Sequence, residues 1–355
     1  MDTPLFTIGI PTYNRPELLL QAIASALNQS YPNVEVVVSD NASDADIESL
    51  VSAVGDSRIR VFRNASNLGS ARNFVGLVEH ARGEYFSWLQ DDDLLHRDFV
   101  SRAVQQMKAQ DACVYVCGAH VSASVNCVSG AYVYAPPFSL DWTSPKTVPI
   151  SAERILGFSL FVSITIPPAM AFQLGALKKS AHQFLDDGHI LFTERTILAH
   201  LATHAKVIAD PVIGATIRDH DGQLWRSEAQ KPNARKKQWA SSALCLDRIA
   251  NSLGDTMIIP EDIFRDIPST ILLAWYREAL AWDDAVALCG KVLAALKLEI
   301  AARQRRGEKI FGDVIIVPAS PAAALLVVKK ALRRLLPPLC WDALSQLKRI
   351  VSARG

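Results

Sequence analysis

Three consecutive aspartates, Asp91, Asp92 and Asp93, follow an apolar run at residues 86–89 that has the character of a buried strand. Carboxylates this close repel one another, so a folded protein keeps them ionised only beside a cation or strong hydrogen-bond donors. Acidic oxygens at the end of a strand suit a hard divalent ion that also binds phosphate oxygens. The alternative to such an ion site is a solvated acidic turn. The elements that precede the aspartates help to decide between these two interpretations.

Strands and helices alternate from residue 6 to residue 89. Apolar or β-branched runs predict four strands, and the helical spacing of apolar residues predicts the helices between them. The first strand should stop at Ile10, because Pro11 has no backbone N–H to donate within a central strand. The alternation and the short links predict an α/β fold with a doubly wound, mostly parallel sheet. The expected strands are residues 6–10, 34–38, 59–62 and 85–89, and the expected helices are residues 17–27, 44–54 and a segment that ends near residue 81.

Ligands of such sheets bind beyond the carboxyl ends of the strands. Three polar loops, residues 12–15, 40–41 and 91–93, fall at those ends. The chain has neither a Gly-x-Gly-x-x-Gly loop nor a Gly-Lys-Ser phosphate loop, so neither standard dinucleotide binding nor Walker-type binding is indicated. The residues therefore favour a nucleoside diphosphate held through a metal ion at this edge of the sheet.

Four side chains in or near these loops carry this expectation. Asp40 is placed to reach the base or the ribose, and Arg72 could supply positive charge to the phosphates. The local alternatives are that Asn14 and Asn41 only form turns and that Arg72 is an exposed residue at the start of a helix.

Composition sets further bounds. The 355 residues suffice for one large domain and an extension, and the formal net charge of +1 gives no argument for nucleic-acid binding. No stretch approaches the roughly 20 uninterrupted apolar residues of a membrane span. The first residues do not look like a signal peptide and the six cysteines lack metal-site spacing, so we expect a cytoplasmic protein. Contact with the cytoplasmic face of the inner membrane is left open.

Four ordered motifs in residues 5–100 resemble those of family 2 glycosyltransferases, which have the GT-A fold, and the likeness continues weakly to about residue 225. The motifs are residues 7–16, 37–43, 67–73, and 83–85 with the aspartates. The resemblance implies a nucleotide-sugar donor, an Mg2+ or Mn2+ ion, and transfer of a glycosyl group, usually with inversion at the anomeric carbon. It implies a nucleotide site formed by Pro11, Thr12, Tyr13, Asn14, Arg15, Asp40, Asn41, Arg72 and Asp91, and a metal site formed by Asp92, Asp93 and His220.

The chain departs from the family pattern Leu-Asp-x-Asp-Asp, because Gln90 takes the place of the first aspartate. The Asp-x-Asp motif is then either the set Asp91 to Asp93, or only Asp92 and Asp93 act. Asp92 is central in both alignments, so we expect it to be the direct metal ligand.

An inverting transfer needs a carboxylate that deprotonates the acceptor hydroxyl. The candidates are Asp187 and Glu194. In the family a Glu-Asp pair opens a helix in this region, and here Arg195 takes the usual place of the aspartate. The alternatives are that Glu194 only complements a helix dipole and that Asp187 forms a turn. His220 belongs to a segment similar to the family's Arg-x-His segment, which closes over the diphosphate, but it could also be a simple loop histidine.

We expect a GT-A domain at residues 1–225, with a nucleotide-sugar half at 1–117 and an acceptor half at 118–225, and a helical C-terminal domain at 226–355. A basic amphipathic helix at about 322–336 either lies on an anionic membrane or packs on the helical domain. The resulting hypothesis is a metal-dependent glycosyltransferase that acts on a glycan or lipid-linked glycan of the O-antigen or capsule type. The rival hypothesis is a catalytically degenerate nucleotide- or glycan-binding scaffold at the membrane. A sugar nucleotidyltransferase would need a Gly-rich, basic N-terminal loop, which residues 11–16 do not form.

Overall fold

The computed structural model describes residues 3–122, 130–134, 147–159, 167–181, 193–218, 220, 245–253, 259 and 287–306. The chain folds into two compact units, the first made of residues 1–152 and 164–242 and the second of residues 153–163 and 243–355. Asp187, the expected domain boundary at residue 225 and the amphipathic segment at 322–336 lie outside the described residues. The predictions that concern them stay predictions.

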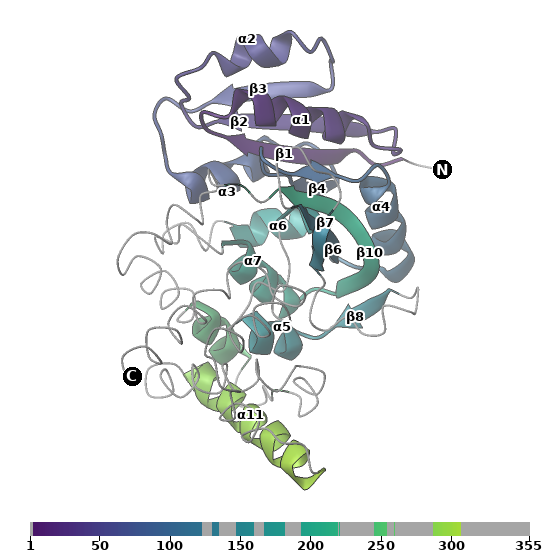
Figure 1. Ribbon diagram of the computed structural model, residues 1–355, viewed down its shortest axis with the longest axis vertical. Helices are drawn as coiled ribbons and strands as arrows, with labels where there is room; N and C mark the ends of the chain where they lie inside the picture. Colours follow the sequence, from purple (N-terminus) through teal and green to yellow (C-terminus); the bar gives the residue numbers. More distant parts are fainter. Residues whose placement is uncertain are drawn as a thin grey trace, which may run out of the picture. The chain divides into compact units, whose positions relative to one another are not determined.

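A ten-stranded sheet forms the centre of the first unit (Figure 1). Its order is β3-β2-β1-β4-β9-β6-β10-β5, with β7 beside β6 and β8 beside β10. The strands β1 to β4 are mutually parallel, β6 is parallel to β10, and β9 runs antiparallel between β4 and β6. The prediction of a mostly parallel α/β sheet is confirmed. The bounds are β1 Phe6–Thr12, β2 Val34–Asp40, β3 Ile59–Arg63, β4 Tyr85–Trp88, β5 Leu94–Leu95, β6 Val114–Ser122, β7 Gly130–Tyr134, β8 Val148–Ile150, β9 Met170–Gln173 and β10 Val207–Arg218.

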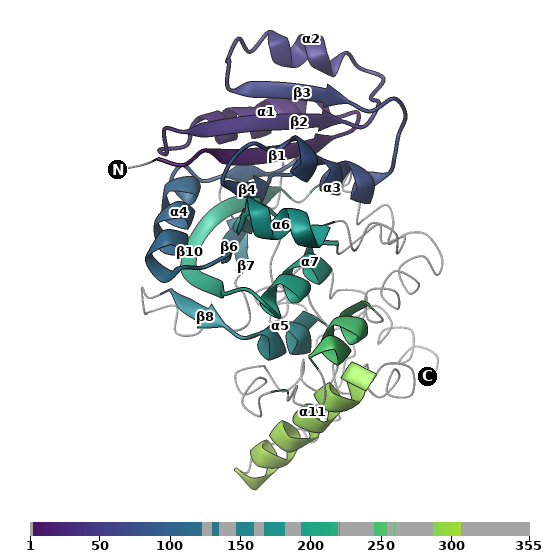
Figure 2. The ribbon, with the colours of Figure 1, turned by 180° about the vertical axis from the view of Figure 1, so that it is seen from behind.

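Helices cover both faces of this sheet, as the front and back views show (Figures 1 and 2). The helices α1 (Pro16–Leu27), α2 (Ile47–Ser52) and α4 (Phe99–Gln110) share one apolar core with alternate side chains of the strands, such as Ile8 and Ile10 of β1. On the other face lie α3 (Ser70–His80) and α6 (Leu174–Ala181), and α7 (Thr193–Ala202) packs on α6. Strands buried on both faces read as continuous apolar runs, which is why the sequence signals them clearly.

Pro11 does not end the first strand, contrary to the prediction. β1 continues to Thr12, and Pro11 pairs with Ser39 of β2. The pairs between β1 and β4 end earlier, at Gly9 opposite Trp88. Because β4 no longer accompanies β1 at Pro11, the missing N–H breaks no ladder on that side.

Aromatic packing fixes the end of β4, where the acidic residues begin. The ring of Trp88 stacks on Phe74 of α3 with a centroid separation of 4.3 Å, and its Nε1 donates to the Phe74 carbonyl at 2.7 Å. On the neighbouring strand, a Cβ at Gly9 would lie 2.8 Å from the Phe86 ring, so glycine lets β1 and β4 approach there. Fully buried Trp88 therefore anchors the strand just before the turn that carries the aspartates.

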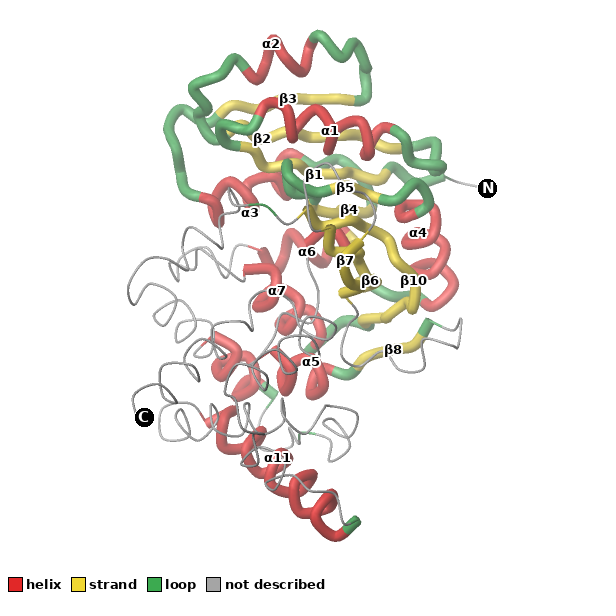
Figure 3. Tube along the Cα trace, in the orientation of Figure 1, coloured by secondary structure: helices red, strands yellow, loops and turns green. Residues whose placement is uncertain are grey.

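β9 was not predicted from the sequence. It has only four residues and follows two prolines, so neither its length nor its pattern separates it from a loop. The strand–helix order of residues 6–89, which was predicted, can be followed in Figure 3.

The second unit is described through helical residues. These are α5 (Ala152–Ser159), whose first residue belongs to the first unit, residues 245–252, and α11 (Ala287–Arg305). The last two lie within residues 226–355, where helices were expected. Within α11, Arg303 Nε donates to Glu299 Oε1 at 2.7 Å, and both side chains are buried.

Candidate active site

The turn at residues 91–93, hereafter the acidic turn, lies at the carboxyl ends of the central strands. Asp91, Asp92 and Asp93 are 4%, 6% and 3% exposed. Thr12, the last residue of β1, donates its hydroxyl to Asp91 Oδ2 at 2.8 Å, so the ends of β1 and β4 are joined side by side. The carboxylates are buried and hydrogen-bonded, and the solvated-turn alternative is wrong.

Arg15 supplies positive charge to two of these carboxylates. Its Nη1 lies 3.0 Å from Asp91 Oδ1 and 2.8 Å from Asp92 Oδ2. Arg15 occupies the N-cap position of α1, directly after the loop that leaves β1. The guanidinium therefore bridges two like charges that would otherwise repel each other.

Arg218, the last residue of β10, supports the acidic turn from within the protein. Its backbone N–H donates to Asp93 Oδ1 at 3.1 Å, and its Nε donates to the carbonyl oxygen of Asp92. Its Nη1 donates to Gln21 Oε1 on α1. The side chain is fully buried, so it fixes the backbone of the turn against β10 and α1. Arg218 itself contacts Asp92 and Asp93, and the expected position of its segment over a diphosphate stays a prediction.

His220 meets the acidic turn from the segment that follows β10. Its Nε2 lies 3.1 Å from Asp92 Oδ2, the oxygen that Arg15 also contacts. The structure thus brings together the three residues for which a metal role was expected, Asp92, Asp93 and His220.

Burial dominates the electrostatics of the acidic turn. It raises the pKa of Asp91 to about 6, and the charge of Asp92 adds to that effect. Burial, with Asp92 second, raises the pKa of Asp93 as well. Burial also acts to raise the pKa of Asp92, but the hydrogen bond from His220 and the charge of Arg15 outweigh it, so the pKa is lowered. Because burial disfavours the ionised forms of Asp91 and Asp93, a cation bound beside them would stabilise their negative charges.

Asp40 ends β2 one strand away from the acidic turn, but its carboxylate faces its own loop. Oδ1 accepts the N–H of Ser43 at 2.9 Å, and Oδ2 accepts Nη1 of Arg63 at 2.5 Å. The side chain is 1% exposed. Both oxygens of Asp40 are engaged, so the expected contact with a base or ribose stays a prediction that requires Arg63 to move.

Asn41 shapes the neighbouring loop through hydrogen bonds of its side chain, and its expected contact with a nucleotide stays a prediction. Its Oδ1 accepts from the N–H of Leu68 at 2.9 Å and from Asn64 Nδ2 at 3.1 Å. Its Nδ2 donates to Asn67 Oδ1 at 2.9 Å. Asn41 is buried, and these contacts agree with the alternative that it forms a turn.

Asn14 joins the loop after β1 to the loop after β2. Its φ of 55° lies in the left-handed region, which asparagine tolerates better than most residues. Its N–H donates to Ser43 Oγ at 2.8 Å, and its side-chain oxygen accepts the N–H of Asp44 at 2.7 Å. Asn14 is therefore a turn former that is also exposed at the site.

Exposed side chains surround these loops. Tyr13 is 44% exposed and Leu68 is 47% exposed. Arg72 is exposed near the start of α3, and Pro11 is half-buried beside Thr12. These groups can meet a ligand that lies on the strand ends, whereas Asp40 and Asn41 lie beneath them.

The two candidates for the catalytic base differ in what the structure describes. Glu194 lies in the first turn of α7 and is partly buried beside Arg195, which is 2% exposed. Asp187 lies outside the described residues. The base stays a prediction.

Within the described part of the chain, no group of three or more His, Cys, Asp and Glu side chains is arranged to hold a metal ion. The described residues by themselves thus form no closed cage for an ion. Mg2+ and similar ions are often bound through one or two carboxylates together with substrate phosphates, and that geometry is compatible with Asp92 and its surroundings.

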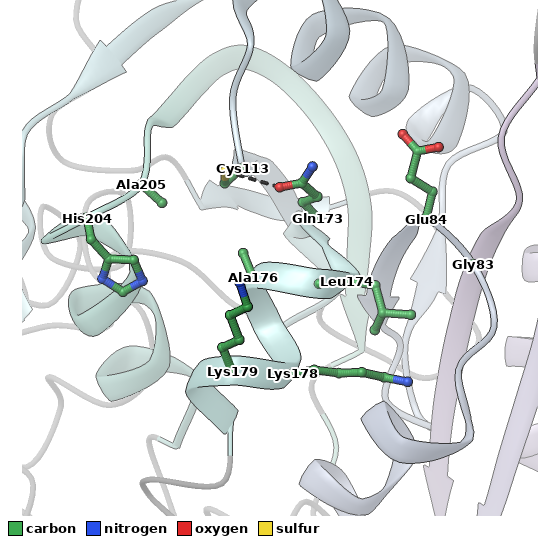
Figure 4. A pocket seen from close by; sticks show the side chains of 11 residues that line it. Gly83, Glu84, Cys113, Gln173, Leu174, Ala176, Lys178, Lys179, His204 and Ala205 are labelled. Carbon is green, nitrogen blue, oxygen red and sulfur yellow. Dashed lines mark hydrogen bonds between the residues drawn. The ribbon is translucent and has the colours of Figure 1, made fainter.

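A cavity of about 580 Å³ lies at the ends of the strands opposite to the acidic turn (Figure 4). Its lining comes from the amino ends of β4, β6 and β10, from the end of β9 and from α6, and includes Glu84, Cys113, Gln173, Lys179 and His204. The Sγ of Cys113 lies 3.4 Å from Gln173 Oε1 on its wall. Because the acidic turn follows the carboxyl ends of the strands, this cavity is not part of the candidate site.

Two comparisons by sequence with known proteins identify the family of this chain. The model of the family "Glycosyl transferase family 2" matches residues 7–147, the region that supplies the strand ends and the acidic turn. A glycosyltransferase of Rickettsia prowazekii, RP339, is 32% identical over 314 residues, which are 86% of this chain and 93% of that protein. The chain belongs to glycosyltransferase family 2.

Other similarities of this family 2 glycosyltransferase are more partial. A Campylobacter jejuni protein named GalNAc(5)-diNAcBac-PP-undecaprenol beta-1,3-glucosyltransferase is 35% identical over 118 residues, 32% of this chain and 38% of that protein. Matches to several other relatives likewise span about a third of the relative's length. The Staphylococcus aureus protein TarS, residues 1–349, solved with UDP-GlcNAc, superposes with a TM-score of 0.52 at 16% identity, over 85% of this chain and 92% of that one. That likeness shows the GT-A fold.

Among the helices that the structure describes, none has both the length and the apolar character needed to cross a membrane.

Proposed function

We propose that this chain is a divalent-cation-dependent glycosyltransferase. It transfers a sugar, with inversion at the anomeric carbon, from a nucleoside diphosphate donor to a glycan or lipid-linked glycan acceptor. Family membership supports the transfer reaction. One observation carries the metal and donor assignments: buried Asp91, Asp92 and Asp93 stand at the carboxyl ends of the central strands, and His220 contacts Asp92.

The residues of the acidic turn fit an Mg2+ or Mn2+ ion. Carboxylate oxygens are the ligands that both ions prefer, and the imidazole of His220 is an additional ligand that Mn2+ accepts. Asp92 is the central ligand, with Asp93 and His220 beside it. When bound, the ion supplies positive charge to the donor's diphosphate and so stabilises the leaving nucleotide. To ligate through Nε2, His220 must give up its hydrogen bond to Asp92 and present a lone pair.

The chain's own residues prepare the donor site. Arg218 holds the backbone of the acidic turn, and Thr12 orients Asp91, so the carboxylates are fixed before a donor arrives. Tyr13 offers an exposed ring against which a base or sugar can stack, and Arg72 offers an exposed cation to the phosphates.

Glu194 is our candidate for the base that takes the proton from the acceptor hydroxyl, because it is the carboxylate at the start of α7 in the second half of the unit. A lipid-linked acceptor of a surface polysaccharide is proposed by analogy with the name of the Campylobacter relative. Contact of the basic C-terminal segment with the cytoplasmic face of a membrane is part of the same proposal.

A ligand screen tests the donor and metal assignments. The thermal midpoint of the full chain is measured with UDP, GDP and dTDP and their sugars, in Mn2+ and in EDTA. One nucleotide should stabilise the chain in Mn2+, by about 2.7 kcal/mol at a hundredfold excess over Kd, and far less in EDTA. Equal stabilisation in EDTA would remove the metal assignment.

A turnover assay with the selected donor separates the enzyme from a degenerate scaffold. The enzyme releases nucleotide from the sugar donor, slowly when water accepts the sugar and faster when a suitable acceptor is present. A scaffold binds the donor without releasing nucleotide.

A further inference from the structure

Two arginines contact the acidic turn, and they are held in different ways. Arg218 is fully buried, and it is bound by its backbone N–H, its Nε and its Nη1 to three different acceptors. The Arg15 side chain is 25% exposed, and its Nη1 contacts both Asp91 and Asp92. Arg218 is thus a fixed part of the turn, whereas Arg15 approaches it from the solvent side.

Arg15 contacts the oxygen at which an ion would bind. Its Nη1 lies 2.8 Å from Asp92 Oδ2, and His220 Nε2 lies 3.1 Å from the same atom. An ion shared by Asp92 and His220 would need this oxygen and would place two positive charges next to the guanidinium. Like charges at that separation repel strongly in a buried site, so Arg15 and the ion exclude each other.

A displaced Arg15 has a new partner close by. The ion brings the diphosphate of the donor to the strand ends, and phosphate oxygens are strong acceptors for a guanidinium. Arg15 sits at the N-cap position of α1 next to Tyr13 and Asn14, the exposed residues of the same loop. It can therefore turn from the carboxylates to a phosphate without any change of the strands.

We propose that Arg15 is an exchangeable counter-ion. It neutralises Asp91 and Asp92 while the site holds no ion, and it passes to the donor's diphosphate when ion and donor bind together. This inference rests on the proposed function. The exchange makes the ion bind weakly alone and tightly with the nucleotide, because only the nucleotide gives Arg15 a replacement for the carboxylates.

Free Mn2+, measured by electron paramagnetic resonance during titration, tests the exchange. Wild type, Arg15→Met and Arg15→Lys are titrated with Mn2+ alone and with Mn2+ at fixed UDP, GDP or dTDP, each corrected with a protein-free titration. Arg82→Met is the matched control, since Arg82 is an exposed arginine just before β4, at the opposite edge of the sheet.

Arg15→Met should bind Mn2+ alone at least about fivefold more tightly than wild type, the low end of typical coupling. The gain in Mn2+ affinity caused by the nucleotide should shrink by a similar factor. Arg15→Lys should lie between the two, and Arg82→Met should match wild type. In EDTA the thermal midpoint of Arg15→Met should fall below that of wild type, and Mn2+ should restore it, which also shows that the variant folds.

Equal Mn2+ affinity of wild type and Arg15→Met, with an unchanged gain from nucleotide, would overturn the inference while leaving the proposed function intact. If no protein binds Mn2+ with any nucleotide, the proposed function fails. The inference then falls with it. Binding of Mn2+ by Arg15→Met in the absence of nucleotide is the exception, because it would support the competition between Arg15 and the ion and would refute only the transfer of Arg15 to the donor's diphosphate.

Discussion

The replacement Asp92→Asn keeps the shape of the side chain and removes one negative charge from the acidic turn. In the ion-free protein Asp92 Oδ2 accepts from Arg15 at 2.8 Å and from His220 at 3.1 Å. Exchanging these charge-assisted hydrogen bonds for neutral ones costs about 1–2 kcal/mol. The loss of repulsion with Asp91 and Asp93 acts in the opposite direction. We therefore expect the thermal midpoint in EDTA to change by no more than about 4 °C.

The effect on the ion should be far larger. Loss of an outer partner of a metal ligand costs roughly 10- to 100-fold in affinity or activity, and Asp92 is expected to be a direct ligand. Mn2+ affinity in the presence of nucleotide and donor turnover should each fall by at least about 100-fold, or about 2.7 kcal/mol.

The assay pairs Mn2+ titration with nucleotide release from the donor that the ligand screen selects. Asp98→Asn is the control, because Asp98 is an exposed aspartate shortly after the same turn and should behave as wild type. If Asp92→Asn retains more than a tenth of the wild-type Mn2+ affinity and turnover, Asp92 is not the central ligand.

Four further predictions concern other parts of the molecule. Because the pKa of Asp91 is about 6 in the folded chain and about 3.9 when unfolded, the folded chain binds the extra proton between these values. From this group the ion-free protein should gain stability as the pH falls from 7.5 to 5.5, while protection by Mn2+ fades; melting curves in EDTA and in Mn2+ across this range check both trends. Tyr13→Ala should weaken nucleotide binding by about 5- to 100-fold without changing the midpoint of the free protein, since Tyr13 is exposed, and calorimetric titration with the selected nucleotide measures it. Glu194→Gln should lower acceptor-dependent transfer by at least about 100-fold yet leave donor binding unchanged, and unchanged transfer would exclude Glu194 as the base. Gly83→Ala should destabilise the chain by about 1–3 kcal/mol, because its Cβ would lie 2.7 Å from the carbonyl oxygens of Leu5 and Tyr85, and urea unfolding measures the loss.

The fold of the first hundred residues could be predicted because its signals are local. The strands β1, β2 and β4 are buried on both faces, so they appear as apolar runs, and the links between elements are short. Two details of the fold were not predicted. The tolerance of Pro11 depends on where β4 stops pairing with β1, and β9 is too short to carry a pattern. Both depend on neighbours distant in sequence.

The candidate site was predicted in part for the same reason. The residue types at the strand ends located the acidic turn, and a family motif pointed to His220. Whether a polar residue at such an edge faces a ligand or its own loop is not encoded locally. Asp40 and Asn41 have the same chemistry as nucleotide ligands, yet Arg63 and residues 64–68 engage them from another loop.

The order and types of residues 6–93 alone determined an α/β sheet with carboxylates gathered at one edge, because burial and strand ends leave a pattern in the chain itself. Only the tertiary structure decided the charge balance at that edge. Arg15 comes from the start of α1, whereas Arg218 and His220 come from the end of β10 and the residues just after it, more than 120 residues from Asp92. Their contacts exist only because β1, β4 and β10 end at the same place.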